Sequence, residues 1–264
     1  MKKITVGMIG GGNMGSAIIA GIYKKFAVGV CEQDQERAQA LKQKYKVGCG
    51  DLKTIVAQSK IIILAVKPQN FDDVLGQLRS YLTKDHLVIS IAAGITCAYI
   101  EKRLAGNVRV IRTMPNLPAQ VAQAMTGMCR GQFATEKDLT CASQIFSNIG
   151  KIVLVDEKFM DALTAVSGSG PAYVFLFIEC LQKAGVRLGF SDEISKLLVY
   201  QTFQGALSLL EKENVAASIL RERVTSKGGT TQAALDVFEK NKIEKIFTKA
   251  LLAARKRAKE LAKK

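Results

Sequence analysis

The sequence has no tryptophan, only four prolines and a single histidine, His86, in 264 residues. Its six cysteines form no C-x-x-C pair, so the ligand spacing of a zinc site is lacking and no metal is expected. The cysteines are expected to be reduced and mostly buried, as small apolar residues. His86 lies in a turn that enters a predicted strand, where we expect a structural or solvent-facing role.

By inspection, no apolar run approaches the roughly 18 residues expected of a membrane-spanning helix. The first segment, MKKITVGMIGGG, has a short apolar stretch that breaks into glycines. We interpret it as a first strand rather than a signal peptide. Since 48% of the residues are apolar, a sizeable core is expected. These features predict a cytoplasmic protein that does not engage a membrane.

Acidic residues are few relative to basic ones, 23 against 38, which gives a net charge of +15. Such a charge favours anionic partners. Much of the excess lies in residues 239–264, where apolar residues recur at helical spacing. The lysines there are therefore expected on the solvated face of a packed helix. No aromatic-rich basic surface accompanies the charge, so nucleic acid is not an expected partner.

Short apolar runs alternate with helical patterns in the first half of the chain. The expected strands lie near 3–10, 28–32, 61–66, 86–94, 107–115, 125–129 and 152–155, and the expected helices near 14–24, 35–45, 71–81 and 97–104. This alternation is typical of a parallel, doubly wound sheet. We predict an α/β protein whose residues 1–155 form a Rossmann-type dinucleotide-binding domain.

After about Asp156 only helical patterns remain. Residues 171–189 and 191–214 predict two helices, and apolar residues cover more than one face of the second. Such a helix must be buried on several sides, which a small helical domain cannot achieve alone. We infer that residues 156–264 form an all-α dimerisation and substrate-binding domain that packs against a second copy.

A glycine pattern, IGGGNMG, follows the first predicted strand and opens the first predicted helix. Gly10 permits the tight turn, Gly12 lets the backbone approach a pyrophosphate, and Gly15 lets helix and strand pack closely. The pyrophosphate would lie at the free N–H groups of the helix start, beside Asn13 and Met14.

The second predicted strand ends at Glu32, about 20 residues beyond the glycines, where an acid accepts hydrogen bonds from the adenosine ribose. A carboxylate there favours NAD(H), because it repels a 2′-phosphate. Arg37 and Lys67 are cations that could compensate for this repulsion. The choice between the two dinucleotides stays open at this point.

Two further predicted strands end in residues expected at the same edge of the sheet. Ligands of open α/β sheets bind at the carboxyl ends of the strands. The alternative for the first of these segments is a strand terminator with a solvated lysine. The residues predicted to contact the cofactor here are Ala65, Val66, Lys67, Pro68, Ala92 and Ala93.

Two segments rich in glycine and hydroxyl side chains precede predicted helices in the second half, at 167–170 and 228–231. Each offers N–H groups, hydroxyls and a helix amino terminus, which together suit a carboxylate. Ordinary helix capping by serine or threonine is the alternative. Two such segments in a protein with a dinucleotide site favour the ligand-binding interpretation.

The segments IGGGNMG, AVKPQ, RTMPNLPA, AVSGSGPAYVFLFIE and LRERVTSKGGTTQAALDVFE resemble those of pyrroline-5-carboxylate reductases, in the same order, from residue 9 to 239. The resemblance implies reduction of 1-pyrroline-5-carboxylate to L-proline, the last step of proline biosynthesis, with NADP(H) or alternatively NAD(H). It implies an interlocked homodimer, with decamers as a larger assembly. It also implies that Thr231 is the catalytic residue, near the ring nitrogen of a cyclic imino acid whose carboxylate is bound by Ser167, Gly168, Ser169, Gly229, Thr230 and Thr231.

The sequence departs from that family at Lys227, where proline is usual, and at Leu117, where threonine is usual. These changes would act on substrate affinity or rate. A β-hydroxyacid dehydrogenase shares the fold plan but needs a lysine and an asparagine one turn apart on the helix that begins at Pro171, which has neither in the right place here. A deazaflavin-dependent NADP reductase lacks the motifs of the helical half. A non-catalytic nucleotide sensor is the alternative from another class, and it would not consume NADH or NADPH when pyrroline-5-carboxylate is added.

Overall fold

The computed structural model describes residues 5–261. The first two residues of the first predicted strand and the last three of the basic C-terminal segment lie outside the described residues. The chain divides into two compact units. The first comprises the residues up to Ser169 together with those from Ala253 onward, and the second is Gly170–Leu252.

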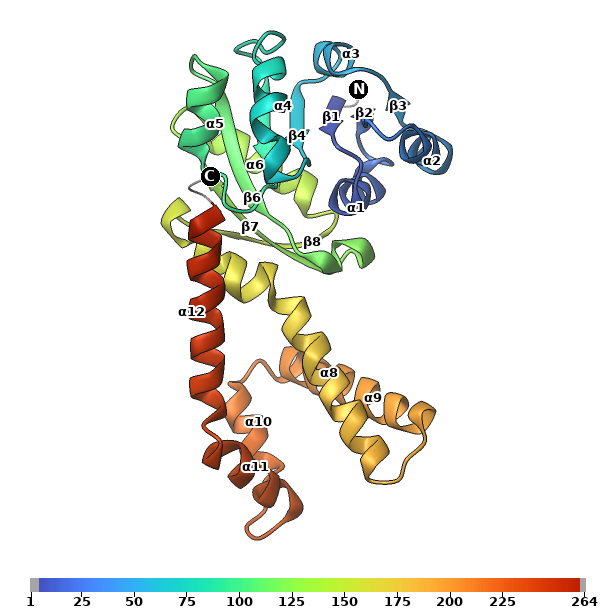
Figure 1. The fold of residues 1–264 in the computed structure, drawn as a ribbon, viewed down its shortest axis with the longest axis vertical. Coiled ribbons are helices and arrows are strands. Elements are labelled where there is room, and N and C mark those ends of the chain that lie inside the picture. The colour runs from blue at the N-terminus through green and yellow to red at the C-terminus, as the bar shows by residue number, and fades with distance from the viewer. Residues whose placement is uncertain (1–4, 262–264) are drawn as a thin grey trace. The chain divides into compact units, whose positions relative to one another are not determined.

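An eight-stranded sheet forms the first unit (Figure 1). In spatial order its strands are β3 (Gly48–Cys49), β2 (Ala27–Cys31), β1 (Thr5–Ile9), β4 (Ile61–Leu64), β5 (Leu87–Ser90), β6 (Arg109–Met114), β7 (Ala124–Arg130) and β8 (Gly150–Leu154). The strands from β3 to β6 are parallel to their neighbours, with a reversal of strand order between β1 and β4. The predicted Rossmann-type sheet is confirmed.

Helices cover both faces of this sheet. They are α1 (Asn13–Ile22), α2 (Gln35–Tyr45), α3 (Leu52–Ala57), α4 (Phe71–Leu78), α5 (Cys97–Leu104) and α6 (Glu136–Phe146), followed by the single turn α7 (Met160–Leu163). Alternate strand residues, such as Ile63 and Ile62, belong to separate hydrophobic clusters. Strands buried on both faces explain why their sequences are continuous apolar runs. The sequence patterns did not reveal β3, α3 or α6.

The sheet is not parallel throughout, because β7 runs antiparallel to β6. Only residues 115–123 connect these two strands, and part of that connection is a 3₁₀ turn, Leu117–Val121. A parallel crossover needs about a dozen residues or more, usually with a helix. The connection is too short, so the chain turns back, and α6 then supplies a crossover that makes β8 parallel to β7.

The second unit is helical, as the sequence predicts for the chain beyond Asp156. Ser191 caps α9 by accepting a hydrogen bond from the Ile194 N–H. The final helix begins in this unit and ends in the first one. The helices of this half are α8 (Gly170–Arg187), α9 (Asp192–Glu213), α10 (Ala217–Arg223), α11 (Thr230–Lys240) and α12 (Ile243–Leu261).

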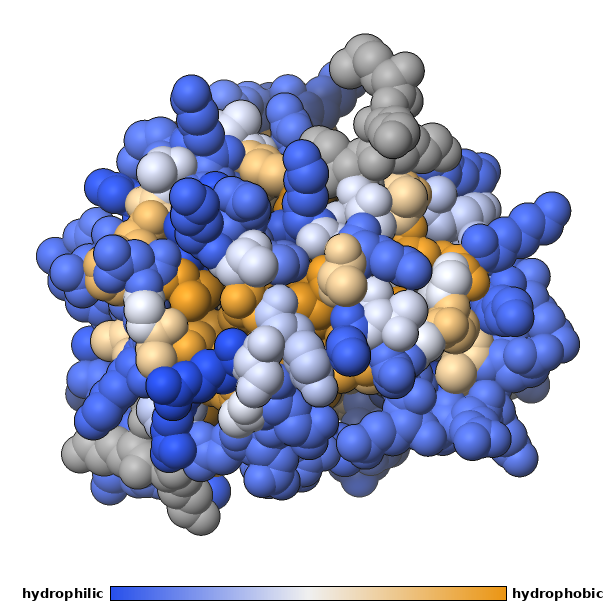
Figure 2. Space-filling view, turned by 90° about the horizontal axis from the view of Figure 1, so that it is seen from above, coloured by the Kyte–Doolittle hydropathy of each residue, from blue (hydrophilic) through white to orange (hydrophobic). Residues whose placement is uncertain are grey.

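Apolar side chains are widely exposed in this unit, with Leu197 on α9 68% exposed and Leu188, just beyond α8, 81% exposed. The continuous helical stretch Glu157–Arg187 contains an 18-residue window of mean hydropathy 1.3, of which 6% is buried. By length and composition alone, this stretch is apolar enough to cross a membrane. The expectation that no such run exists was wrong, because serine, threonine and glycine divide the stretch into short apolar pieces while its mean hydropathy stays high. On the face of the molecule seen in Figure 2, hydrophobic residues lie between predominantly hydrophilic ones.

Candidate active site

The turn between β1 and α1 has a shape that requires glycine at two positions. Gly10 has φ 97°, and its N–H donates to the Cys31 carbonyl at 2.8 Å. A Cβ at Gly10 would lie 2.7 Å from the Ala65 carbonyl oxygen, and a Cβ at Gly15 only 2.3 Å from that of Gly10. Both glycines therefore hold the turn tightly between β1 and the end of β4.

Gly12, the remaining glycine of the pattern, faces open space. Gly12 is the N-cap of α1, no side chain caps this helix, and a Cβ at Gly12 would meet nothing within 4 Å. Ser16 Oγ lies 2.6 Å and 2.8 Å from the carbonyl oxygens of Gly11 and Gly12, which fixes the turn from behind. The first N–H groups of α1 are left for an anion, as the pyrophosphate hypothesis requires.

A cavity of about 960 Å³ lies at the carboxyl ends of β1, β2 and β4, beside this turn. Its size is that of a small-molecule or cofactor site. Of the residues predicted to contact the cofactor, it brings together Gly10, Gly12, Glu32, Ala65, Val66 and Lys67. Asn13, Met14 and Gly15 lie in the adjoining first turn of α1, Pro68 begins the turn after β4, and Ala92 and Ala93 follow β5.

Glu32 lies in this cavity with its side chain only 9% exposed. Its Oε2 accepts a hydrogen bond from the Gly11 N–H at 2.7 Å, and its Oε1 one from the Asp34 N–H at 3.0 Å. Burial acts to raise the pKa of Glu32, but these N–H groups and the Arg37 guanidinium outweigh it and hold the pKa below its ordinary value. Glu32 is therefore a fixed anion at neutral pH.

The Ser167–Gly168 segment is not the loop that the sequence suggested. It forms a π-helical turn, Thr164–Gly168, continuous with α7 before it and α8 after it. The Ser169 N–H is engaged, because it donates to the Thr164 carbonyl at 2.8 Å. Single π turns of this kind are frequent at functional sites.

Asn116 fixes the position of this turn, and sequence reasoning did not single it out. Its Nδ2 donates to the Ser167 carbonyl at 3.1 Å and to the Ser167 hydroxyl at 3.3 Å. Its Oδ1 accepts from the Met125 N–H at 2.9 Å. The signal was present, since Asn116 lies in the RTMPNLPA segment, but the pairing with a residue 51 positions later is visible only in the fold.

The Gly229–Thr231 segment is the start of a helix, as predicted. Gly229 is the N-cap of α11, and no side chain makes a capping hydrogen bond to this helix. A Cβ at Gly229 would lie 2.4 Å from Ser226 Oγ. Thr230 and Thr231 form the first turn of α11, and Thr231 is half-buried. The first N–H groups of α11 remain open to an anion.

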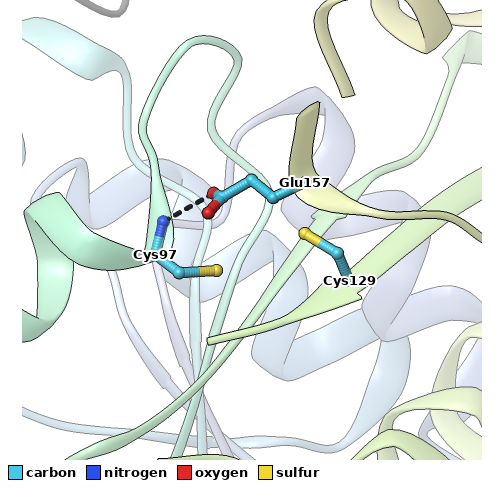
Figure 3. A group of neighbouring side chains, drawn as sticks. All are labelled: Cys97, Cys129 and Glu157. Atoms are coloured by element: carbon cyan, nitrogen blue, oxygen red, sulfur yellow. Dashed lines mark hydrogen bonds between the residues drawn. The ribbon is translucent and has the colours of Figure 1, made fainter. Parts of the chain in front are cut away.

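A cluster formed by Cys97, Cys129 and Glu157 is the best arrangement for a cation among the described residues, since its three ligand atoms lie within 4.8 Å of one another (Figure 3). However, Oε1 of Glu157 accepts from the Cys97 N–H at 2.8 Å and from Arg112 Nη1 at 3.2 Å. The guanidinium thus supplies at this carboxylate the positive charge that a metal would supply. The cluster is therefore a hydrogen-bonded packing arrangement in which the Arg112 guanidinium takes the place of a metal ion.

Only some expectations about cysteine and histidine are confirmed. Cys97 and Cys129 are buried, but Cys49 and Cys180 are exposed, so the expectation of mostly buried cysteines was wrong. His86 has a structural role, because it is 8% exposed, its Nδ1 accepts from the Thr83 N–H at 2.9 Å, and its Nε2 lies 3.2 Å from the Val56 carbonyl.

A glycine turn at the reversal of strand order, in a chain that also has a helical second unit, is typical of dinucleotide-dependent oxidoreductases of the Rossmann class. Comparison with known proteins makes this more specific. Residues 5–94 match the family described as NADP oxidoreductase, coenzyme F420-dependent, and residues 157–261 match pyrroline-5-carboxylate reductase dimerisation. The chain is 38% identical over 270 residues to a pyrroline-5-carboxylate reductase of Methanosarcina acetivorans, with 100% of both chains covered.

Solved structures agree with this assignment. A pyrroline-5-carboxylate reductase from Coxiella burnetii is 35% identical in sequence, and its structure superposes over 100% of both chains with a TM-score of 0.92. The enzyme from Plasmodium falciparum, with NADP bound, is 31% identical with a TM-score of 0.89, and covers 99% of both chains. The chain belongs to the pyrroline-5-carboxylate reductase family.

Proposed function

We propose that this protein reduces 1-pyrroline-5-carboxylate to L-proline with NAD(P)H, the last step of proline biosynthesis. Similarity to pyrroline-5-carboxylate reductases along the whole chain is the observation that carries the proposal. The glycine turn and the uncapped start of α11 supply the two anion-binding features that the cofactor and the substrate need.

The cofactor site is the cavity beside the glycine turn. Gly10, Gly12 and Gly15, with the start of α1 at Asn13 and Met14, hold the pyrophosphate, and Glu32 holds the adenosine ribose. The segments that follow β4 and β5, residues 65–68 and 92–93, complete this edge of the sheet. When bound, the reduced nicotinamide supplies a hydride to the imine carbon.

The substrate needs orientation more than acid–base catalysis. A protonated cyclic imine is already electrophilic, so the chief requirement is to hold the imine carbon about 3–3.5 Å from the hydride donor. The Ser167–Ser169 turn and the Gly229–Thr231 helix start bind the substrate carboxylate, and Asn116 keeps Ser167 in place. The Thr231 hydroxyl hydrogen-bonds near the ring nitrogen.

Replacement of Thr231 by alanine tests this role. Loss of one hydrogen bond to the reacting ring should lower kcat about 100-fold, in the range seen when one transition-state donor is removed. The dissociation constant for NADH or NADPH should stay within about twofold of the wild-type value. Thr140→Ala is a matched control, because this threonine is exposed and its hydroxyl donates only to the Glu136 carbonyl. Wild-type kinetics for Thr231→Ala would exclude the proposed role.

We also infer that residues 156–264 form the dimerisation and substrate domain of a cytoplasmic homodimer, with a decamer as a larger assembly. The match to a dimerisation family over residues 157–261 supports this proposal. A second copy would cover the exposed apolar side chains, including those of the apolar stretch that ends at Arg187. The side chains concerned are Phe175, Leu176, Leu181, Leu188, Ile194, Leu197, Leu207, Val237 and Phe238. Sedimentation equilibrium without detergent should give at least twice the chain mass of 28.6 kDa, and a monomer would refute the inference.

A further inference from the structure

The end of β2 carries a carboxylate whose position is set before any ligand arrives. Both oxygens of Glu32 accept backbone N–H groups, one from the glycine turn and one from Asp34. The Gly11 N–H belongs to the turn proposed to bind the pyrophosphate. A ribose attached to that pyrophosphate would therefore meet a fixed anion at its 2′ and 3′ hydroxyls.

The nearest cation is occupied. Arg37 Nη1 lies 3.4 Å from Glu32 Oε2, and Nη2 lies 3.1 Å from Asp34 Oδ2. The guanidinium is thus shared by two carboxylates. A 2′-phosphate would have to compete with both carboxylates for Arg37, and both negative charges would stay beside the phosphate.

The other charges that line the cavity do not reverse this balance. Asp72 and Asp73 lie in the first turn of α4, and Lys67 precedes it. Asp72 pairs with Arg103 at 3.2 Å, so its charge is offset. The charges of Asp73 and Lys67 then cancel in the net charge of the cavity lining. The charged side chains lining the cavity are Glu32, Asp34, Arg37, Lys67, Asp72 and Asp73, so four acids stand against two bases.

We propose that Glu32 makes this enzyme select NADH over NADPH, and that it does so partly by keeping Arg37 from acting as a 2′-phosphate anchor. The inference rests on the proposed role of the cavity as the dinucleotide site. Both dinucleotides bind, and NADH binds more tightly. The relative from Plasmodium falciparum was solved with NADP bound, so the inference concerns this chain's own residues rather than the family.

Direct binding tests the proposal without use of the reaction. Titration calorimetry with ADP-ribose and with its 2′-phosphate measures recognition of the adenosine end alone, and fluorescence titration with NADH and NADPH measures the whole cofactor. The wild-type protein should bind each 2′-hydroxyl ligand at least about tenfold more tightly than its 2′-phosphate counterpart.

Glu32→Gln removes the charge and keeps an acceptor for the Gly11 N–H, so the fold of the turn should survive. In this variant the preference should fall to about parity or reverse, because Arg37 is released toward the 2′-phosphate. Glu32→Gln combined with Arg37→Ala should lose the gained affinity for the 2′-phosphate. Glu36→Gln is the matched control, since Glu36 lies in the first turn of α2 outside the cavity lining, and its ratio should equal the wild-type ratio.

A wild-type preference for the 2′-phosphate ligands, or an unchanged ratio in Glu32→Gln with an unaltered unfolding midpoint, would overturn the proposal. If no dinucleotide binds, the site itself is wrongly assigned and the inference fails with it. If NADH binds with the expected preference but pyrroline-5-carboxylate is not reduced, the selectivity stands and the proposed function fails.

Discussion

Arg112 is the buried charge on which the junction of β6, α5 and α7 depends, so its removal is the sharpest test of the packing. Its side chain is 3% exposed, and the guanidinium lies 3.2 Å from Glu157 Oε1 and 3.5 Å from Asp161 Oδ1. Arg112→Met keeps much of the apolar length of the side chain and removes the charge. Two neighbouring carboxylates then lose their shared cation.

Breaking a buried pair by removing one partner costs about 3–5 kcal/mol. The lower end applies here, because the side chains of Glu157 and Asp161 retain 32% and 19% exposure, so water offsets part of the loss. We therefore expect the free energy of unfolding to fall by about 3 kcal/mol. For a chain of this size that corresponds to a Tm lower by roughly 6–12 °C.

Urea unfolding followed by circular dichroism at one fixed protein concentration measures this change, since assembly makes stability depend on concentration. Arg103→Met is the matched control, because its pair with Asp72 at 3.2 Å is half-exposed and should be worth less than about 1 kcal/mol. Adding Glu157→Gln to Arg112→Met should restore part of the stability, because one unpaired charge is then removed. If Arg112→Met costs no more than Arg103→Met, the guanidinium does not hold this junction.

Two further predictions concern the glycine turn and the buried thiol. Gly15→Ala should abolish NADH binding in a fluorescence titration, because the new Cβ would lie 2.3 Å from the Gly10 carbonyl oxygen, whereas Gly48→Ala, with its nearest neighbour 4.0 Å away, should bind normally. The pKa of the Cys97 thiol is raised by its hydrogen bond with Cys129, by burial and by the Glu157 carboxylate. As the pH passes the ordinary thiol pKa of about 8.5, only the unfolded chain therefore loses the Cys97 proton. The stabilisation from Cys97 is then complete below that pH and falls above it, by up to about 1.4 kcal/mol per pH unit in urea titrations; an equally steep fall in Cys97→Ala would show that Cys97 is not the cause.

The glycine turn and the cavity that we propose as the nucleotide site were largely predictable because their signals are local. The glycine turn, Glu32 and the strand end at Ala65 each belong to a short pattern whose geometry repeats wherever a strand, a tight turn and a helix follow one another. The strand β7 was predicted, but its antiparallel direction was missed, because the pattern of a strand does not show which way it runs. That direction was set by the length of the 115–123 connection.

The contacts that sequence reasoning missed join distant residues. Asn116 meets Ser167, and Arg112 meets Glu157 and Asp161, and no periodicity links such positions. The π turn at Thr164–Gly168 was also invisible, because one extra residue in a helix leaves no mark that distinguishes it from a serine- and glycine-rich loop.

The first unit is not continuous along the chain, since the residues from Ala253 onward belong to it and Ala258 is 4% exposed. During synthesis on the ribosome, the nucleotide-binding half is made first but lacks this final piece until residues 170–252 have been added. Joining the two parts closes a long loop, and the entropic cost of closure grows only slowly with loop length. We therefore expect the last step of folding in the nucleotide-binding unit to wait until the residues from Ala253 onward have been made, so that the helical half is already present when that unit is completed.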